Sequence, residues 1–528
     1  MLALSALALV LGGRNALAIS SSYNKASLGH ELSASGEEGT FVPQSCLSDA
    51  DFSAVVQRFS KFLQFRTTSS PTAPDHVLDP AEFRRLHAWL PQAYPEVWAA
   101  LKVEEVGSNG LSFLLTWPGS QPPGGPLLPV LLLSHLDVVP VANETLAQWE
   151  HPPFSGAVAG GYVWGRGAMD DKVGVSGLLE AATLLLREGW APRRTLYLAF
   201  GQDEEVGGDK GAARIADLLE QRGVKVDMVY DEGGSIGRDG FPPYSPHPLA
   251  LVGLAEKGYA TINIQINATG GHSSIPPLDG SSVAAVAARV VTAIDRRPPP
   301  TRLVEPVASF LAAIAPATPG LRGRLFALSR QLPWVGGLVA AAFLGRDTPE
   351  TAALVRDTAA VTGLTLGFAD NVLPPGGTVR VNFRLLPGSS VDDVLDYLTQ
   401  VVGRDLPYLR FEARGDHNAS TATPVTSPDS PYFAMLRTAV QEVYQLEGGK
   451  GTVAVAPTLM AGGTDSKHYL RLSVGGALRH VPTSMNKTAG DMRRVHGLNE
   501  RVSVGDLGRC VCVHVRLLQM LGAGAPAA

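Results

Sequence analysis

Imidazole and carboxylate side chains recur in this chain directly after apolar runs or at the start of helical patterns. His135 and Asp137 follow the apolar residues 127–133, a run typical of a strand buried on both faces. Residues two apart on an extended chain face the same way, so Asp137 can orient the His135 imidazole while the other ring nitrogen binds a metal. Further candidates stand at similar positions: Asp170, Glu204, Glu205, Asp231, Glu232 and His496.

Two imidazoles and several carboxylates, without a thiolate, form a ligand set that suits a pair of zinc ions. In two-metal hydrolytic sites one carboxylate can bridge the ions, and Asp170, behind a Gly-rich turn, is the candidate bridge. The adjacent Glu204 and Glu205 cannot point the same way from an extended chain. One can therefore bind metal while the other acts as a general base toward water.

Taken singly, each acidic group has a structural explanation that needs no metal. Asp170 could belong to a helix cap, and Asp231 with Glu232 could form an ordinary turn before two glycines. Glu204 and Glu205 could lie in a solvated loop. The recurrence of such groups at five separate strand or helix ends favours one shared site.

Strand and helix patterns alternate through the first half of the chain with short Gly-rich turns between them. This order predicts an α/β catalytic sheet with parallel strands and helices on both faces. The expected helices cover residues 51–65, 81–89, 173–187 and 212–221, and the expected strands cover residues 103–117 (a pair), 127–133, 195–200 and 226–230.

The pattern changes near residue 257. Residues 261–267 and 379–385 alternate strictly, with one apolar face, whereas residues 281–294 and 391–402 have helical spacing. We therefore expect a ferredoxin-like α+β lid domain, residues 257–417, inserted between catalytic segments 46–256 and 418–528. Its apolar helical insert, residues 304–362, is either buried or an exposed surface that receives an apolar ligand.

The length, the net charge and the N-terminal residues indicate the class of protein and its expected location. With 528 residues the chain exceeds one compact core, and its net charge of −5 without a long basic run argues against nucleic acid as a partner. Residues 1–18 have the pattern of a signal peptide or a short membrane anchor, and residues 19–45 that of a mobile lead-in. We therefore expect secretion or a vacuolar, endomembrane location, in agreement with four sequons at Asn143, Asn267, Asn418 and Asn486.

Three cysteines, Cys46, Cys510 and Cys512, are too few for a disulfide framework, and no Cys-x-x-Cys motif occurs. Cys510 and Cys512 alternate within an apolar run and are expected to be buried. A bridge from Cys46 to either of them remains open at this point.

A series of motifs between about residues 52 and 518 resembles the aminoacylase/carboxypeptidase family of di-zinc metallopeptidases. Within this family the chain looks most similar to the subgroup of vacuolar carboxypeptidase S and the secreted N-fatty-acyl-amino-acid synthase/hydrolase. The motifs occupy residues 134–140, 149–156, 165–172, 203–205, 231–233, 271–274, 371–374 and 494–500.

The resemblance implies two zinc ions per chain and assigns a role to each candidate. Glu204 would be the general base and Asp137 would orient His135. Glu232 is favoured over Asp231 as a ligand because it immediately precedes the glycine, although both are kept. The implied ligands are His135, Asp170 and the Asp231–Glu232 carboxylate for one ion, and Asp170, Glu205 and His496 for the other.

The resemblance also implies substrate contacts in the lid. His272 matches a histidine that in dimeric relatives reaches the partner's active site and polarises the scissile carbonyl, which implies a homodimer through the lid. Asn371 and Arg384 resemble residues that bind the substrate carboxylate, and Gly463 and Thr464 lie in a Gly-rich loop that faces the substrate.

These features predict a zinc-dependent amide hydrolase for N-acyl amino acids, which could also run in reverse and condense acid with amine. The apolar insert favours a long acyl chain. A carboxypeptidase that releases C-terminal residues from short peptides is the first alternative. A non-catalytic secreted scaffold is the alternative from another class, and missing ligands would be its signature.

Overall fold

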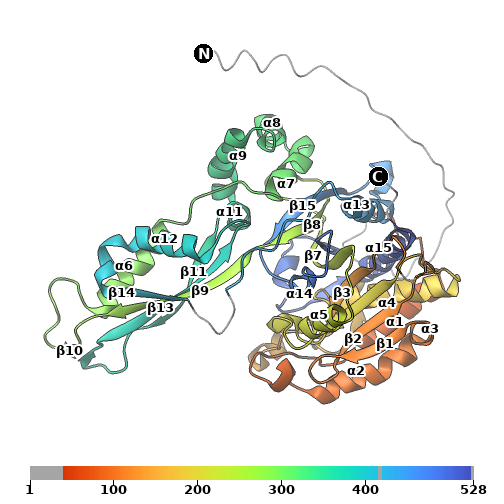
Figure 1. Cartoon of the computed structure of the whole chain (residues 1–528), viewed down its shortest axis with the longest axis horizontal. Helices are drawn as coiled ribbons and strands as arrows, with labels where there is room; N and C mark the ends of the chain where they lie inside the picture. Colours follow the sequence, from red (N-terminus) through yellow and green to blue (C-terminus); the bar gives the residue numbers. More distant parts are fainter. Residues whose placement is uncertain (1–39, 44, 123, 414–418, 525–528) are drawn as a thin grey trace, which may run out of the picture.

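The computed structural model describes residues 40–43, 45–122, 124–413 and 419–524. The expected signal segment 1–18, most of the lead-in 19–45 and the sequon at Asn418 lie outside the described residues. Figure 1 shows a catalytic domain on the right, an elongated lid domain on the left and a helical lobe above the sheet between them.

The catalytic domain is built on one mixed eight-stranded sheet. Its strand order is β1-β2-β6-β3-β7-β16-β8-β15. Strands β6, β3, β7 and β16 are parallel, as expected, but β1 and β2 are antiparallel additions and β8 runs opposite to β16. The bounds are β1 Lys102–Val106, β2 Ser112–Trp117, β3 Val130–His135, β6 Leu196–Gly201, β7 Met228–Gly237, β8 Leu249–Glu256, β15 Ala454–Met460 and β16 Ala477–Met485.

Helices cover both faces of this sheet, because its central strands are apolar on both sides. Leu132 of β3 packs with the layer formed by α2, α3, α4, α13 and α15, whereas Leu131 and Leu133 face α5 and α14. The bounds are α1 Asp49–Phe62, α2 Pro80–Ala93, α3 Pro95–Ala100, α4 Lys172–Arg187, α5 Ala212–Gln221, α13 Pro431–Val443, α14 Ser466–Tyr469 and α15 Val504–Ala523.

A disulfide joins Cys46 to Cys512 of α15, which resolves the open pairing, and Cys510 is free and buried. Short elements complete the catalytic domain. A small sheet has the order β17-β5-β4, with β4 Ala157–Ala159, β5 Tyr162–Trp164 and β17 Arg501–Ser503. The 3-10 turns are η2 Pro74–His76, η3 Asn143–Gln148, η4 Glu204–Val206, η8 Glu447–Gly449 and η9 Asp491–Arg493.

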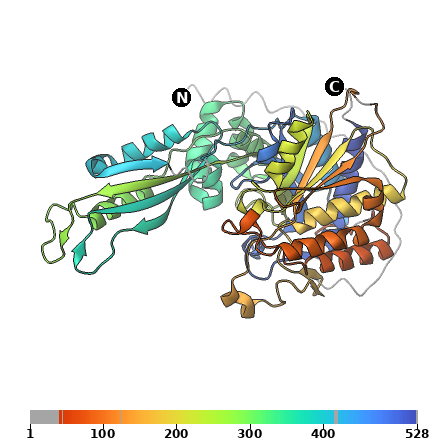
Figure 2. The same cartoon turned by 60° about the horizontal axis from the view of Figure 1, so that its bottom comes forward.

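The lid domain has the expected strand–helix–strand–strand–helix–strand order. Its antiparallel sheet, β11-β13-β9-β14, is covered by α6 and α12. Ile262, Ile264 and Phe383 are buried between the sheet and these two helices. The far tip is formed by the pairing of β10 with β12 (Figure 2). The bounds are β9 Gly258–Asn267, β10 Gly271–His272, α6 Val283–Arg296, β11 Thr358–Thr365, β12 Val372–Leu373, β13 Gly376–Leu385, α12 Val391–Val402, η7 Gly403–Tyr408 and β14 Leu409–Ala413.

Residues 307–355 form a helical lobe. The predicted helical segment 304–362 is too long at its end, because residues from Thr358 onward pair with β13 and belong to β11. The lobe packs on β8 and β15 and therefore extends the catalytic core. It contains α7 Val307–Ile314, η5 Ala315–Ala317, α8 Gly320–Ser329, α9 Pro333–Val339, the π-helical η6 Ala340–Leu344, α10 Gly345–Asp347 and α11 Pro349–Val355. Among the described residues, no helix has the length and apolarity needed to cross a membrane.

Candidate metal centre

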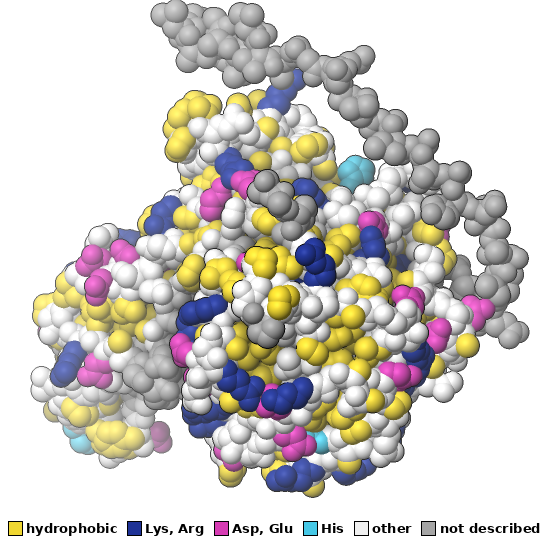
Figure 3. Space-filling view, turned by 45° about the vertical axis from the view of Figure 1, so that its right-hand side comes forward, with side chains coloured by type: hydrophobic (Ala, Val, Ile, Leu, Met, Phe, Trp, Pro, Cys, Tyr) yellow, Lys and Arg dark blue, Asp and Glu magenta, His cyan; other side chains and the backbone are white. Residues whose placement is uncertain are grey.

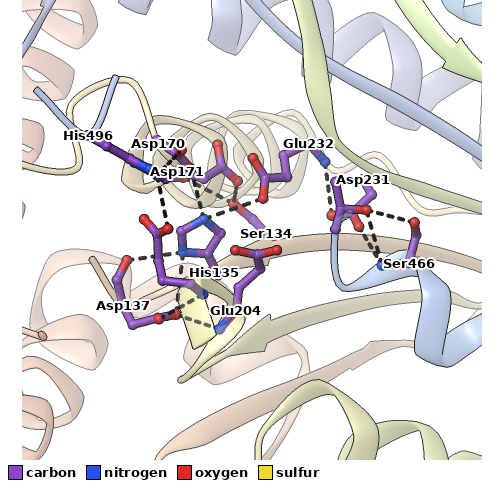
Figure 4. Close-up of polar contacts among 12 residues, drawn as sticks. Ser134, His135, Asp137, Asp170, Asp171, Glu204, Asp231, Glu232, Ser466 and His496 are labelled. Carbon is purple, nitrogen blue, oxygen red and sulfur yellow. Dashed lines mark hydrogen bonds and ion pairs between the residues drawn. The ribbon is translucent and has the colours of Figure 1, made fainter. Parts of the chain in front are cut away.

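Strand β3 ends at His135, whose imidazole is at the centre of a polar cluster (Figure 4). Its Nε2 lies 3.0 Å from Oδ1 of Asp170 and 3.5 Å from Oε1 of Glu232. Its Nδ1 donates to the main-chain oxygen of Asp137 at 3.0 Å, which leaves Nε2 as the atom free to bind a cation. We call His135, Asp170 and Glu232 the His135 trio.

A second group, the His496 trio, shares Asp170 with the first. Nε2 of His496 lies 3.0 Å from Oδ2 of Asp170 and 3.0 Å from Oε2 of Glu205. Within each trio the ligand atoms all lie within 4.8 Å of one another, a spacing that could hold a metal ion. The two oxygens of Asp170 thus face two different sites, as a bridging carboxylate requires.

An ion pair that the sequence analysis did not predict connects the loop that carries Asp170 to the loop that carries His496. Arg166 and Glu500 are both buried and lie 2.6 Å apart. Glu500 also accepts from the backbone N–H groups of Met169 and Asp170, and Arg166 donates to the carbonyl oxygen of His496 at 3.0 Å. The sequence offered one indication of this pair: each residue is a charged residue inside a Gly-containing motif, Arg166 in 165–172 and Glu500 in 494–500.

The Asp137 carboxylate lies beside the His135 ring, with Oδ1 3.4 Å from Nδ1. Its two oxygens accept from the backbone N–H groups of Glu204 and Glu205, at 3.0 and 3.2 Å, where η4 begins. Asp137 therefore contacts the strand-end imidazole and holds the backbone of the adjacent glutamates. Among the described residues Glu204 belongs to neither trio, and Figure 4 shows its carboxylate beside the His135 ring.

The structure does not bring Asp231 to either trio. Its carboxylate accepts from the backbone N–H groups of Ser466, at 2.7 Å, and Glu232, at 2.9 Å, so it points away from His135 (Figure 4). Adjacent residues of strand β7 face opposite sides, and only Glu232 turns toward the trio. Asp231 instead anchors the loop of residues 462–466.

The same loop is held by a second buried pair that the sequence did not reveal. Thr464 donates through its backbone N–H and its hydroxyl to Oε1 of Glu256, at 2.8 and 2.6 Å. Arg479 donates to the same oxygen at 2.8 Å, and both charged side chains are buried. The sequence indicated this pair only through a charged residue in each of two apolar strands, Glu256 in β8 and Arg479 in β16.

Burial and crowding shift the pKa values of this cluster. Burial and the neighbouring Glu232 raise the pKa of Glu204 well above its usual range, and burial raises that of Glu205 to about 7. Burial lowers the pKa of His135, but its carboxylate neighbours outweigh this effect and the net pKa is raised. Hydrogen bonds to Asp170 and Glu205 raise the pKa of His496 to about 10.

The donor set fits divalent cations. So many carboxylates cannot all be ionised in one crowded, half-buried cluster without compensating positive charge. Oε1 of Glu205 is buried and has no hydrogen-bond partner within the described part of the chain, so it has a free lone pair. Imidazole and carboxylate ligands without thiolate are those of hydrolytic zinc sites.

The predicted substrate residues lie in three places. His272 and Asn371 lie together at the lid tip, where Asn371 accepts from the backbone N–H of Ser273, and β10 lies far from the metal centre in both ribbon views (Figures 1 and 2). Arg384 lies at the end of β13 that is remote from the lid tip, and its guanidinium is 5.0 Å from the ring centroid of Tyr259. Gly463 is exposed, and Thr464 is buried beneath it.

Comparison with known proteins agrees with this geometry. Residues 131–520 match the family model of peptidase family M20/M25/M40. The chain is 31% identical over 90% of its length to a probable carboxypeptidase S-like 2 protein of Dictyostelium discoideum, covering 85% of that protein. It is 33% identical over 84% of its length to the N-fatty-acyl-amino acid synthase/hydrolase PM20D1 of Homo sapiens, covering 82% of it.

A solved structure shares the fold at low sequence identity. The M20 family metallo-carboxypeptidase Sso-CP2 from Sulfolobus solfataricus superposes with a TM-score of 0.61 at 16% identity, over 90% of this chain and 100% of that one. The family match covers most of the chain and includes every residue of both trios. The chain therefore belongs to peptidase family M20/M25/M40, and it is a hydrolytic, metal-binding enzyme that acts on amide bonds.

Proposed function

We propose that this enzyme holds two zinc ions and hydrolyses the amide bond of N-acyl amino acids, with a preference for long acyl chains. The observation that carries the proposal is the shared carboxylate: Asp170 faces His135 with one oxygen and His496 with the other, each at 3.0 Å. His135 and Glu232 complete one site, and Glu205 and His496 complete the other.

When bound, the cations would supply Lewis acidity that polarises the attacking water and the amide carbonyl. Glu204 is the residue that moves the proton. It is half-buried beside the His135 imidazole, its raised pKa favours proton uptake, and its backbone is fixed by Asp137. Glu204 would accept a proton from water during attack and then deliver it to the leaving amine, which becomes the free amino acid.

The substrate class is supported by the two kinds of relative. One is named for N-fatty-acyl amino acids and the other for carboxypeptidase S. Substrates of both kinds carry a free carboxylate beside the amide, and Arg384 offers a forked guanidinium for such a group. A peptide C-terminus is thus the alternative substrate, and reverse condensation of fatty acid with amino acid would use the same residues.

A substrate panel on zinc-loaded protein tests the proposal. N-oleoyl-phenylalanine should be cleaved with a higher kcat/KM than a blocked dipeptide that ends in phenylalanine. N-acetyl-phenylalanine is the matched control for chain length. Faster cleavage of the dipeptide would select the carboxypeptidase alternative, and absence of bound metal in folded protein would favour a non-catalytic scaffold.

We further propose that two chains pair through their lids, so that His272 and Asn371 act on the partner's substrate. Both residues are exposed at the lid tip, remote from their own metal centre. The His272→Ala and Glu204→Gln variants should each be nearly inactive, yet regain activity when mixed, because a mixed dimer contains one complete site. No recovery on mixing, together with a monomeric mass, would contradict this arrangement.

We also propose that the enzyme works in an oxidising compartment, secreted or in a vacuolar lumen. The Cys46–Cys512 disulfide supports this location, and Asn143 and Asn267 are exposed within their sequons. Expression through the secretory pathway should give protein whose mass falls on treatment with an N-glycosidase. Mutating Asn143 and Asn267 to Gln should reduce that shift.

A further inference from the structure

The helical lobe has an apolar surface that the catalytic chemistry does not use. Its exposed large side chains are Leu321 (66% exposed), Trp334 (72%), Leu338 (51%) and Leu332 (37%). They come from α8, α9 and the turn between them, and in Figure 3 the lobe at the top carries apolar side chains on its outer edge. We call these four residues, with Gly337, Ala341 and Ala342, the outer face.

The outer face is distinct from the face that folds the lobe. Val335, Val339 and Leu344 are buried in the same apolar core as α7 and as Ala456 and Leu459 of β15. The opposite side of the same helix is exposed at positions 334, 337, 338, 341 and 342, which recur at helical spacing. A side chain added at Gly337 would meet no atom within 4 Å, so no residue that the structure describes covers this position.

Residues 333–344 are therefore apolar on both sides of one helix. A helix that is hydrophobic all round is normally enclosed by protein or lipid. This run is too short to span a bilayer, which requires about 20 residues. A short apolar helix with an aromatic residue on its exposed side fits the boundary between headgroups and acyl chains, where tryptophan is enriched.

Arginine is the only charged residue type in the stretch 306–346, which carries the outer face, and Asp347 and Glu350 follow this stretch within the lobe. Residues 306–346 contain four arginines and no aspartate or glutamate. Two of them are paired: Arg322 with Asp347 of α10, and Arg330 with Glu305 and Asp429. Arg324 and Arg346 are exposed, and neither forms an ion pair with any residue that the structure describes. An apolar face with unpaired arginines beside it complements a membrane surface that carries anionic headgroups.

We propose that the helical lobe docks the enzyme onto anionic membrane surfaces, with Trp334 and Leu338 inserted below the headgroups and Arg324 and Arg346 against the phosphates. A protein partner fits less well, because the outer face offers few hydrogen-bonding side chains for a polar rim. The attachment of the lobe to β15 would keep the catalytic sheet in a fixed orientation above the lipid. The inference needs only this surface and does not depend on the proposed substrate.

Vesicle sedimentation with the full chain tests the proposal. Vesicles of phosphatidylcholine with 30% phosphatidylserine should bind the protein, and pure phosphatidylcholine should bind it about tenfold more weakly. The double variant Trp334→Glu/Leu338→Glu should lose binding to both vesicle types by at least about tenfold. Arg324→Gln/Arg346→Gln should lose only the preference for phosphatidylserine.

The control variant is Val474→Glu, which places the same charge at a 65%-exposed valine on the catalytic domain. It should bind vesicles as the unmodified protein does. All variants should keep their thermal midpoint and their activity on N-acetyl-phenylalanine, a water-soluble substrate. The proposal is wrong if the unmodified protein does not sediment with anionic vesicles, or if Trp334→Glu/Leu338→Glu still does. It is also wrong if that variant only converts a dimer to a monomer, since the outer face would then join two chains.

Discussion

Oδ2 of Asp170 lies 3.0 Å from Nε2 of His496, although the two residues come from the two separate chain segments of the catalytic domain. The buried pair of Arg166 and Glu500 joins the same two segments and holds both loops. The metal centre is therefore also a junction between parts of the chain. A cation bound there should contribute to the stability of the fold as well as to catalysis.

Removing the cations should lower the thermal midpoint. A ligand that binds only the folded state stabilises it by about 2.7 kcal/mol when its concentration is 100 times its Kd. Dialysis against a chelator should therefore lower the midpoint measured by calorimetry, and zinc should restore it. Elemental analysis of the restored protein should give two ions per chain. An unchanged midpoint, with full activity in chelator, would show that the trios are structural polar clusters.

Replacing His496 should empty one site and spare the other. His496→Gln removes the imidazole shared by Asp170 and Glu205, while His135 and Glu232 remain. Zinc content should fall from two ions to one, whereas Asp170→Asn should weaken both sites. His247→Gln, at an exposed histidine, is the matched control and should keep both ions. Two tightly bound ions in His496→Gln would overturn the assignment of this ligand.

Glu204→Gln should separate catalysis from metal binding. Glu204 lies outside both trios, so the variant should keep its zinc and its thermal midpoint. Loss of the general base should lower kcat by about 10²- to 10⁴-fold with little change in KM. Glu188→Gln, at an exposed glutamate after α4, should leave kcat unchanged. A Glu204→Gln enzyme with undiminished kcat would exclude this residue as the base.

The parts of the site that the sequence predicted are those with local signatures. His135 and Asp137 stand at the end of an apolar strand, and Asp170 precedes a strongly patterned helix, so each could be placed from its own neighbourhood. The lid was predictable for the same reason, because strict alternation in β9 and β13 shows which side is buried.

The parts that could not be predicted depend on contacts between distant segments. The sequence could not decide between Asp231 and Glu232, since the answer lies in the bond from Ser466 to Asp231. The disulfide partner of Cys46 was equally undetermined, because Cys510 and Cys512 lie on the same helix. The end of the helical segment was misjudged because pairing with β13 outweighs helical spacing after residue 357.

Arg479→Met should destabilise the protein through Glu256. The two side chains are 0% and 2% exposed, and removing one partner leaves the other charge buried without its counter-charge. Breaking a buried pair in this way costs about 3–5 kcal/mol, measured here as a loss in the free energy of unfolding in urea. Glu256→Gln combined with Arg479→Met should be less destabilised than the single variant. Arg404→Met, at an arginine 77% exposed, is the control and should change stability little.

Cys46→Ser should destabilise the catalytic domain by removing the disulfide to α15. This bridge closes a loop with a sequence separation of 466 residues, which restricts the unfolded chain strongly. A cross-link of this kind contributes about 2–4 kcal/mol, so the urea midpoint of Cys46→Ser should fall clearly. Dithiothreitol should lower the midpoint of the unmodified protein to the same value and leave Cys46→Ser unaffected. Cys510→Ala, which keeps the bridge, should respond to dithiothreitol as the unmodified protein does. Suppose that reductant releases free thiols from the unmodified protein but leaves its midpoint unchanged. The bridge would then add nothing to the stability of the fold.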